Sequence, residues 1–150
     1  ELQDITCFLL DPAGHGAGCM AGGRVLRGAD FFAGEVGRMP LPGGRCIRDL
    51  VADDVPDEEY IAGVAYLLGA VTCTVNPRIA IFSGRSVRPA LLPEIDRRLR
   101  QRIGFHWEGE GNVCPELVWE PDIWPFYRAG MVYRATRRLH SGVQMVDDVF

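Results

Sequence analysis

The residues best suited to hold a ligand lie close together between positions 35 and 48 of the sequence. Glu35 stands among small residues in the string A-G-E-V-G of residues 33–37, where a carboxylate could accept two hydrogen bonds from the hydroxyls of a sugar. Arg38 and Arg48 follow in the same stretch, and a pair of guanidinium groups suits a carboxylate or a phosphate. A solvated loop glutamate would have the same local sequence, so both interpretations stay open at this point.

A second candidate is the glycine-rich stretch of residues 14–18, which has the sequence G-H-G-A-G. Gly14, Gly16 and Gly18 would let the backbone approach a phosphate closely, with N–H groups as donors. A tight hairpin turn is the simpler interpretation, and since we expect no helix after it, the stretch is not a dinucleotide-binding fingerprint. In that interpretation His15 is an exposed turn residue.

The composition excludes several other classes of function. Sixteen basic residues face 20 acidic ones, and the net charge of −4 argues against a general nucleic-acid surface. All 16 basic residues are arginines, which excludes mechanisms that need a P-loop lysine or a Schiff base. No apolar run approaches the roughly 18 residues of a membrane-spanning helix. Five scattered cysteines without a C-x-x-C spacing indicate a reducing, cytoplasmic compartment.

The periodicity of the chain predicts an α/β domain with a mixed sheet packed against helices. Three short strands joined by tight turns form an antiparallel meander, and an irregular segment at 28–54 precedes alternating helices and strands. The expected strands are 4–10, 17–21, 24–27, 79–82 and 117–120, and the expected helices are 56–75, 93–103 and 125–140. We expect the last helix to turn Ala129, Val132 and Thr136 toward the core.

The length of 150 residues matches one domain. The sequence starts at Glu1, without a methionine, and enters a strand almost at once. We therefore expect a piece of a longer polypeptide, with part of any active site outside it.

Taken in order, five strings resemble motifs of the ROK family of sugar kinases and sugar-responsive repressors. They are residues 14–18 (family G-T-G-I-G-A-G), 22–28 (N-G-x-L-x-R-G), 33–39 (A-G-E-I-G-H-M), 66–84 (a helix, then N-P-E-x-I-V-L-G-G-G) and 129–135 (A-G-L-I-G-A-A). The resemblance runs through most of the chain. It implies that residues 1–150 are the C-terminal lobe of an actin-like, RNase H-like (ASKHA) fold, whose N-terminal lobe is missing.

The resemblance implies a sugar site made of Glu35, Arg38 and Arg48. Glu35 matches the glutamate of the family motif G-E-x-G-H, whereas Arg38 replaces its histidine and Arg48 replaces a second sugar-binding glutamate. These two substitutions favour an anionic ligand, a sugar phosphate or a sugar acid. The family's zinc-binding cysteine cluster is reduced to Cys46, and one cysteine does not complete a tetrahedral site. We therefore expect no zinc.

The resemblance also implies a nucleotide side, where backbone at four glycines would lie against phosphates: Gly14, Gly16, Gly18 and Gly84. This side departs from the family. Pro12 and Ala13 replace the first glycine and the threonine of the phosphate turn, and bulkier residues flank Gly84. Neither Asp4 nor Asp11 fits the motif of the catalytic aspartate, the general base of such kinases. We expect no catalytic residue here, and ATP with magnesium only in a full-length protein.

Three functions are compatible with these patterns. The leading one is the effector domain of a transcriptional regulator, which senses a sugar or sugar phosphate while an upstream helix-turn-helix contacts DNA. The second is one lobe of a divergent ATP-dependent sugar kinase. The third is a degenerate paralogue with a structural or dimerisation role, and a homodimer is expected in any case. An aromatic group in the last third should lie in the core or at a subunit interface: Trp107, Trp119, Trp124, Phe126 and Tyr127.

Overall fold

A mixed β-sheet organises the computed structural model, which describes residues 3–52, 54–103 and 113–140. In these residues the sheet has five strands, namely β1 (Ile5–Asp11), β2 (Gly14–Ala21), β3 (Arg24–Val25), β4 (Ile79–Ser83) and β5 (Glu116–Trp119). The order is β3-β2-β1-β4-β5, with β3, β2 and β1 antiparallel and β1, β4 and β5 parallel. The predicted antiparallel meander within a mixed sheet is confirmed.

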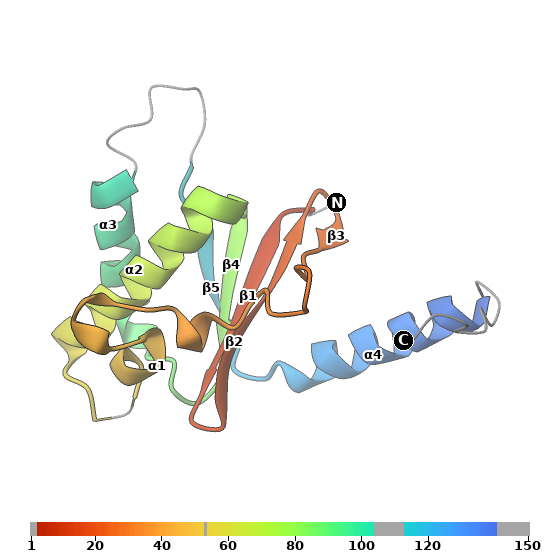
Figure 1. The fold of residues 1–150 in the computed structure, drawn as a ribbon, viewed down its shortest axis with the longest axis horizontal. Helices are drawn as coiled ribbons and strands as arrows, with labels where there is room; N and C mark the ends of the chain where they lie inside the picture. The colour runs from red at the N-terminus through yellow and green to blue at the C-terminus, as the bar shows by residue number, and fades with distance from the viewer. Residues whose placement is uncertain (1–2, 53, 104–112, 141–150) are drawn as a thin grey trace.

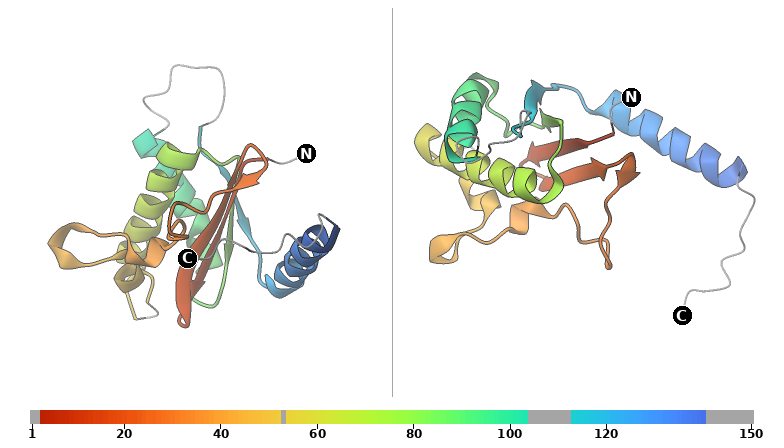
Figure 2. Two further views of the ribbon diagram at one scale, coloured as in Figure 1. Left: turned by 45° about the vertical axis from the view of Figure 1, so that its right-hand side comes forward. Right: turned by 90° about the horizontal axis from the view of Figure 1, so that it is seen from above.

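In the described part of the chain, the α-helices that precede β5 lie on one side of the sheet. The α-helices are α1 (Ile47–Leu50), α2 (Asp57–Val75), α3 (Leu92–Ile103) and α4 (Trp124–His140), and short 3-10 turns are η1 (Val36–Arg38), η2 (Pro42–Gly44) and η3 (Pro89–Leu91). Three acidic residues stand in the first turn of α2, where they complement the positive end of the helix dipole. Helices α2 and α3 lie on the same side of the sheet in Figures 1 and 2.

The hydrophobic core lies between that face of the sheet and the two helices. Phe8 and Leu10 of β1 are fully buried, whereas Leu9 between them is 40% exposed, as the alternation of a strand requires. Phe8 stacks on Phe82 of β4 with 4.9 Å between ring centroids. Ile95 of α3 is also fully buried in this core. The burial of these apolar side chains is the main driving force of the fold.

The glycine-rich stretch is a strand rather than the predicted turn. The turn between β1 and β2 is only Pro12-Ala13, because β2 begins at Gly14 and Gly14 pairs with Asp11. The Asp11 carboxylate accepts a hydrogen bond from the Ala13 amide at 3.0 Å, which fixes this two-residue turn. Gly16 and Gly18 therefore lie inside β2, two and four residues after its first residue, Gly14.

The prediction that one face of the last helix packs against the core is wrong. Ala129, Val132 and Thr136 are exposed, because α4 runs away from the sheet on the side opposite α2 (Figures 1 and 2). The expectation of a buried aromatic group fails for Trp124, Phe126 and Tyr127, which are 55–62% exposed. Trp119 packs against the core, and Trp107 lies outside the described residues. A subunit interface for the exposed aromatic side chains stays a prediction.

Tyr60 of α2 ties the helix layer to the segment after β4. Its ring is buried, its hydroxyl donates to the Ser86 carbonyl oxygen at 3.0 Å, and it accepts from the Arg88 amide at 3.2 Å. The Arg88 guanidinium lies over the ring, 4.5 Å from its centroid, and forms an ion pair with Asp57 at 2.7 Å. One hydroxyl thus satisfies two backbone groups in a poorly hydrated site.

Replacing Tyr60 by phenylalanine should lower the free energy of unfolding by about 1–3 kcal/mol, since two backbone groups lose their partner. Urea unfolding followed by circular dichroism measures the change. Tyr66→Phe is the matched control, because Tyr66 lies on the same helix with 43% of its surface exposed. Equal stability of the two variants would contradict the role of the Tyr60 hydroxyl.

Candidate functional site

The segment that carries Glu35 is attached to the outer edge of β2. The Ala17 amide donates to the Gly34 carbonyl oxygen at 2.7 Å, and the Val36 amide donates to the same oxygen at 2.7 Å. Gly34 has φ +96°, and a Cβ there would overlap the Ala17 carbonyl oxygen. Only glycine fits this position. The attachment covers part of a strand edge that would otherwise expose unpaired backbone groups.

His15 lies beneath this segment and is not the exposed turn residue that we expected. It is a partly buried residue of β2, and Gly37 packs against its Cβ so closely that a Cβ on Gly37 would lie only 2.7 Å away. Within the described part of the chain its Nε2 atom is buried and meets no hydrogen-bond partner. Burial lowers the pKa of His15, the positive charge of Arg48 lowers it further, and Asp11 raises it. His15 is therefore neutral at pH 7.

Glu35, Arg38 and Arg48 gather on one surface region. The Arg38 guanidinium lies 3.7 Å from the Glu35 carboxylate, and the two side chains are 62% and 50% exposed. The exposed Arg48 donates from Nε to the Cys46 sulfur at 3.3 Å. A backbone hydrogen bond from Ile47 to Met39, 3.1 Å long, holds the Arg48 segment beside the Arg38 segment. The Asp49 carboxylate interacts electrostatically with Arg48, so this region has two cations and the two carboxylates of Glu35 and Asp49.

The residues around Cys46 do not fit the zinc site that the family has. The Cys46 thiol and amide both donate to the Asp49 carboxylate, at 3.2 and 2.7 Å, and so cap helix α1. Among the residues that the structure describes, no group of three or more His, Cys, Asp or Glu side chains could hold a metal ion.

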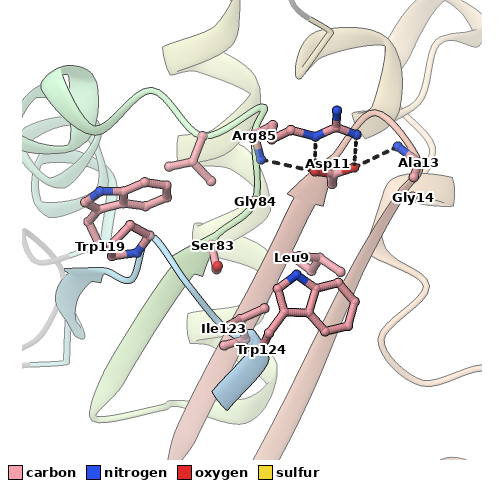
Figure 3. Close-up of a pocket in the computed structure, with 12 residues that line it drawn as sticks. Leu9, Asp11, Ala13, Gly14, Ser83, Gly84, Arg85, Trp119, Ile123 and Trp124 are labelled. Atoms are coloured by element: carbon pink, nitrogen blue, oxygen red, sulfur yellow. Dashed lines mark hydrogen bonds and ion pairs between the residues drawn. The ribbon is translucent and has the colours of Figure 1, made fainter. Parts of the chain in front are cut away.

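A second region is a cleft of about 660 Å³ at the carboxyl ends of the parallel strands. This edge is where open α/β sheets bind their ligands. Figure 3 shows the cleft, which is lined by Leu9, Asp11, Ala13, Gly14, Ser83, Gly84, Arg85, Val87, Trp119, Pro121, Ile123 and Trp124. The structure thus brings together two of the glycines that sequence analysis assigned to a nucleotide, Gly14 and Gly84. Gly16 and Gly18 do not line the cleft.

Gly84 fixes the floor of this cleft. It has φ +106°, and a Cβ there would overlap the backbone of Leu10. The Ser86 amide donates to the Leu10 carbonyl oxygen at 2.9 Å, so the segment after β4 is held against the end of β1. A glycine is needed here because two backbone segments touch, and this packing explains Gly84 without a ligand.

The mouth of the cleft carries a close ion pair. Arg85 donates from Nε and Nη2 to the two oxygens of Asp11, both at 2.9 Å, in the bidentate geometry that guanidinium and carboxylate favour. The Arg85 amide adds a longer hydrogen bond of 3.3 Å to the same carboxylate. The hydrogen bonds from Arg85 and then from Ala13 hold the pKa of Asp11 well below its usual range. Asp11 is therefore ionised at any physiological pH.

Similarity to known proteins comes from structure rather than from sequence. No known family's model and no curated protein matches this sequence. The structure is similar to a ROK family protein from Streptococcus pneumoniae TIGR4 in complex with sucrose (16% identity, TM-score 0.66), covering 93% of this chain and 61% of that one. The structure is also similar to a ROK hexokinase from Thermus thermophilus (19% identity, TM-score 0.60), and the match covers 79% of this chain and 52% of that one. A ROK family transcriptional regulator, a homologue of the Escherichia coli MLC protein (18% identity, TM-score 0.52), is covered over 42% of its length by 79% of this chain.

The chain has the ROK fold. The predicted α/β architecture of the actin-like class is therefore confirmed, with the mixed sheet as its central element. The chain spans about 42–61% of the length of these three neighbours. None of the described helices is both long and apolar enough to cross a membrane.

Three residues that the fold brings into the Glu35 region and the cleft were not expected there from the sequence. His15 was assigned to an exposed turn, and Asp11 and Arg85 are 74 positions apart, so no local pattern could pair them. The parallel pairing of β1 with β4 places their ends side by side and brings the two side chains into contact. An ionisable residue directly after each of two predicted parallel strands is the signal that could have found this pair.

Replacing Arg48 by glutamine should raise the pKa of His15, because a neighbouring positive charge is removed. NMR titration of the imidazole protons measures this shift. Arg38→Gln is the control, since Arg38 does not contribute to the lowered pKa of His15.

The depressed pKa also has a consequence for stability. The folded state binds a proton on His15 less readily than the unfolded state, where the pKa is near 6.5. This difference in proton binding stabilises the folded state. The stabilisation is fully present above that pH and is lost as the pH falls through the folded pKa.

For the Arg48→Gln titration, a His15 pKa that does not change would contradict the proximity of the two residues.

Proposed function

We propose that this chain is the sugar-sensing part of a ROK-type transcriptional regulator and that it binds a phosphorylated or acidic sugar without transferring a phosphoryl group. The observation that carries the proposal is the segment of residues 34–38, which is attached to β2 and presents Glu35 beside Arg38. A sugar site needs a carboxylate that accepts hydroxyl hydrogen bonds from a fixed backbone position.

Two exposed guanidinium groups are the reason to propose an anionic ligand. They belong to Arg38 and Arg48, and the carboxylates of Glu35 and Asp49 lie near them. His15 adds no charge at pH 7, because burial keeps it neutral. A phosphate or carboxylate on the sugar would accept hydrogen bonds from these guanidinium groups, which bind such anions in bidentate geometry. Neutral hexoses offer no anionic group to bind.

The ROK-fold neighbours support both a regulator and a kinase. One is described as a transcriptional regulator, one as a hexokinase and one as a complex with sucrose. The regulator is favoured because positions that the resemblance assigns to zinc and to the nucleotide are changed here. Cys46 is all that remains of the zinc cysteines, and Pro12 and Ala13 stand in the phosphate turn. A kinase in which another segment supplies the catalytic aspartate, the general base of the family mechanism, is the second candidate, and the cleft that Gly14 lines favours it.

The coding sequence upstream of Glu1 separates these two candidates. A basic helix-turn-helix there would support the regulator. An intact D-x-G-G-T phosphate loop together with the catalytic aspartate would support the kinase. The homodimer also belongs to this proposal, and exposed aromatic side chains of α4 such as Phe126 are available for its interface.

A sugar phosphate at ten times its Kd should stabilise the chain by about 1.4 kcal/mol and raise its Tm by about 3–6 °C. The measurement is a thermal-shift panel with glucose, mannose, sucrose, their phosphates, and gluconate. Arg38→Gln and Arg48→Gln should each weaken binding by about 10- to 100-fold, because each removes a charge-assisted hydrogen bond.

Arg24→Gln is the matched control for these variants, since Arg24 is an exposed arginine on β3. Stabilisation by the neutral sugars but not by their phosphates would refute the anionic ligand. Stabilisation by no sugar at all would favour the structural or dimerisation role.

A further inference from the structure

The cleft at the carboxyl ends of β1, β4 and β5 combines an apolar wall with a polar mouth. The apolar side is formed by Leu9, Ile123 and the indole rings of Trp119 and Trp124. In the view of Figure 3, Ser83 lies between the two rings, and the Asp11–Arg85 pair lies at the opposite end of the cleft from Trp124. A volume of about 660 Å³ falls in the range of small-molecule sites. Indole faces at such a site suit a flat ring.

The polar mouth contains the donor set that a phosphate group would use. Four N–H groups converge there, two from the Arg85 guanidinium and one each from the Arg85 and Ala13 backbone. Backbone and guanidinium donors in such a cluster normally bind an anion. In this chain all four already donate to the Asp11 carboxylate, at distances between 2.9 and 3.3 Å.

We propose that this cleft binds a neutral ligand with a flat ring, a nucleoside in the best-fitting case, and that Asp11 acts as a built-in anion that excludes the phosphorylated form. A phosphate entering the mouth would have to displace the carboxylate from four donors and then remain beside its negative charge. A neutral ligand meets neither obstacle, because the ion pair stays intact while the ring occupies the space beside Trp124.

The electrostatics and exposure of the pair agree with this assignment. Asp11 stays ionised because its hydrogen bonds lower its pKa, so the built-in anion is present throughout the physiological range. The Asp11 side chain is 19% exposed and the Arg85 side chain 75% exposed, so a ligand can reach the mouth of the cleft. The proposal goes beyond the sugar site and does not rest on it, since neither residue contacts the segment of residues 34–38 through a hydrogen bond described here.

Calorimetric titration of the 150-residue chain with two matched pairs, adenosine with 5′-AMP and guanosine with 5′-GMP, tests the proposal. At least one nucleoside should bind, and its 5′-phosphate should bind at least about tenfold more weakly. In Asp11→Asn the phosphate should gain at least about tenfold in affinity while the nucleoside changes little, because the donors are released. In Arg85→Gln the phosphate should bind even more weakly than to the wild type, since the carboxylate remains without its main cation.

Matched controls separate the cleft from general effects of mutation. Asp30→Asn removes an exposed carboxylate from a loop residue that does not line the cleft and should leave the ratio of affinities unchanged. Trp124→Ala should abolish nucleoside binding, whereas Phe126→Ala should not, although both side chains lie on α4 and are about equally exposed (61% and 62%). Circular dichroism confirms that each variant is folded.

Three results would overturn the proposal. One is wild-type binding of a 5′-phosphate as tight as that of its nucleoside, or tighter. Another is the failure of both nucleosides to bind at millimolar concentration. The third is an unchanged preference in Asp11→Asn, which would show that the carboxylate is not the excluding group. Sugar binding at Glu35 can succeed or fail independently of these outcomes.

Discussion

The hydrogen bond from the Ala17 amide to the Gly34 carbonyl oxygen fixes the segment that carries Glu35 against the sheet. A strand edge has N–H groups that need partners, and β2 satisfies this one with the segment that carries Glu35 rather than with another strand. The left-handed backbone of Gly34 makes the close approach possible. Once the segment is attached, Gly37 packs over His15 and Glu35 stands beside Arg38. The attachment therefore sets both the position and the charge of the region that we propose binds a sugar.

The middle of β2 and the turn of the β1–β2 hairpin lie beside regions of different chemistry. Near the middle of β2, exposed guanidinium groups are available for an anion. At the turn, the donors that could bind a second anion are occupied by the Asp11 carboxylate. Phosphoryl transfer needs phosphate groups held at such donors. An internal carboxylate in their place agrees with a protein that senses a ligand rather than one that phosphorylates it, and Gly84 is then retained for the packing of two backbone segments.

Much of the fold was predictable, because local patterns specify it. Alternation gave the strands, and the acidic first turn together with Asn76-Pro77 bounded helix α2. The errors arose where tertiary contacts decide. Residues 14–18 resemble a turn in composition, yet pairing with β1 extends β2 back to Gly14. The apolar spacing of α4 predicts a buried face, but no described element covers Val132. The assignment of Glu35, Arg38 and Arg48 to a sugar site came from motif resemblance and stays a prediction, whereas the contacts of His15 and of the Asp11–Arg85 pair depend on the sheet topology.

Amide hydrogen exchange at Ala17, followed by NMR in the wild type and in Gly34→Ala, tests the central constraint most directly. The account predicts that the Ala17 amide is protected as well as the amides that pair β1 with β2, and that Gly34→Ala removes this protection while the rest of the sheet keeps its own. An Ala17 amide that already exchanges in the wild type as fast as an unbonded loop amide would contradict the account.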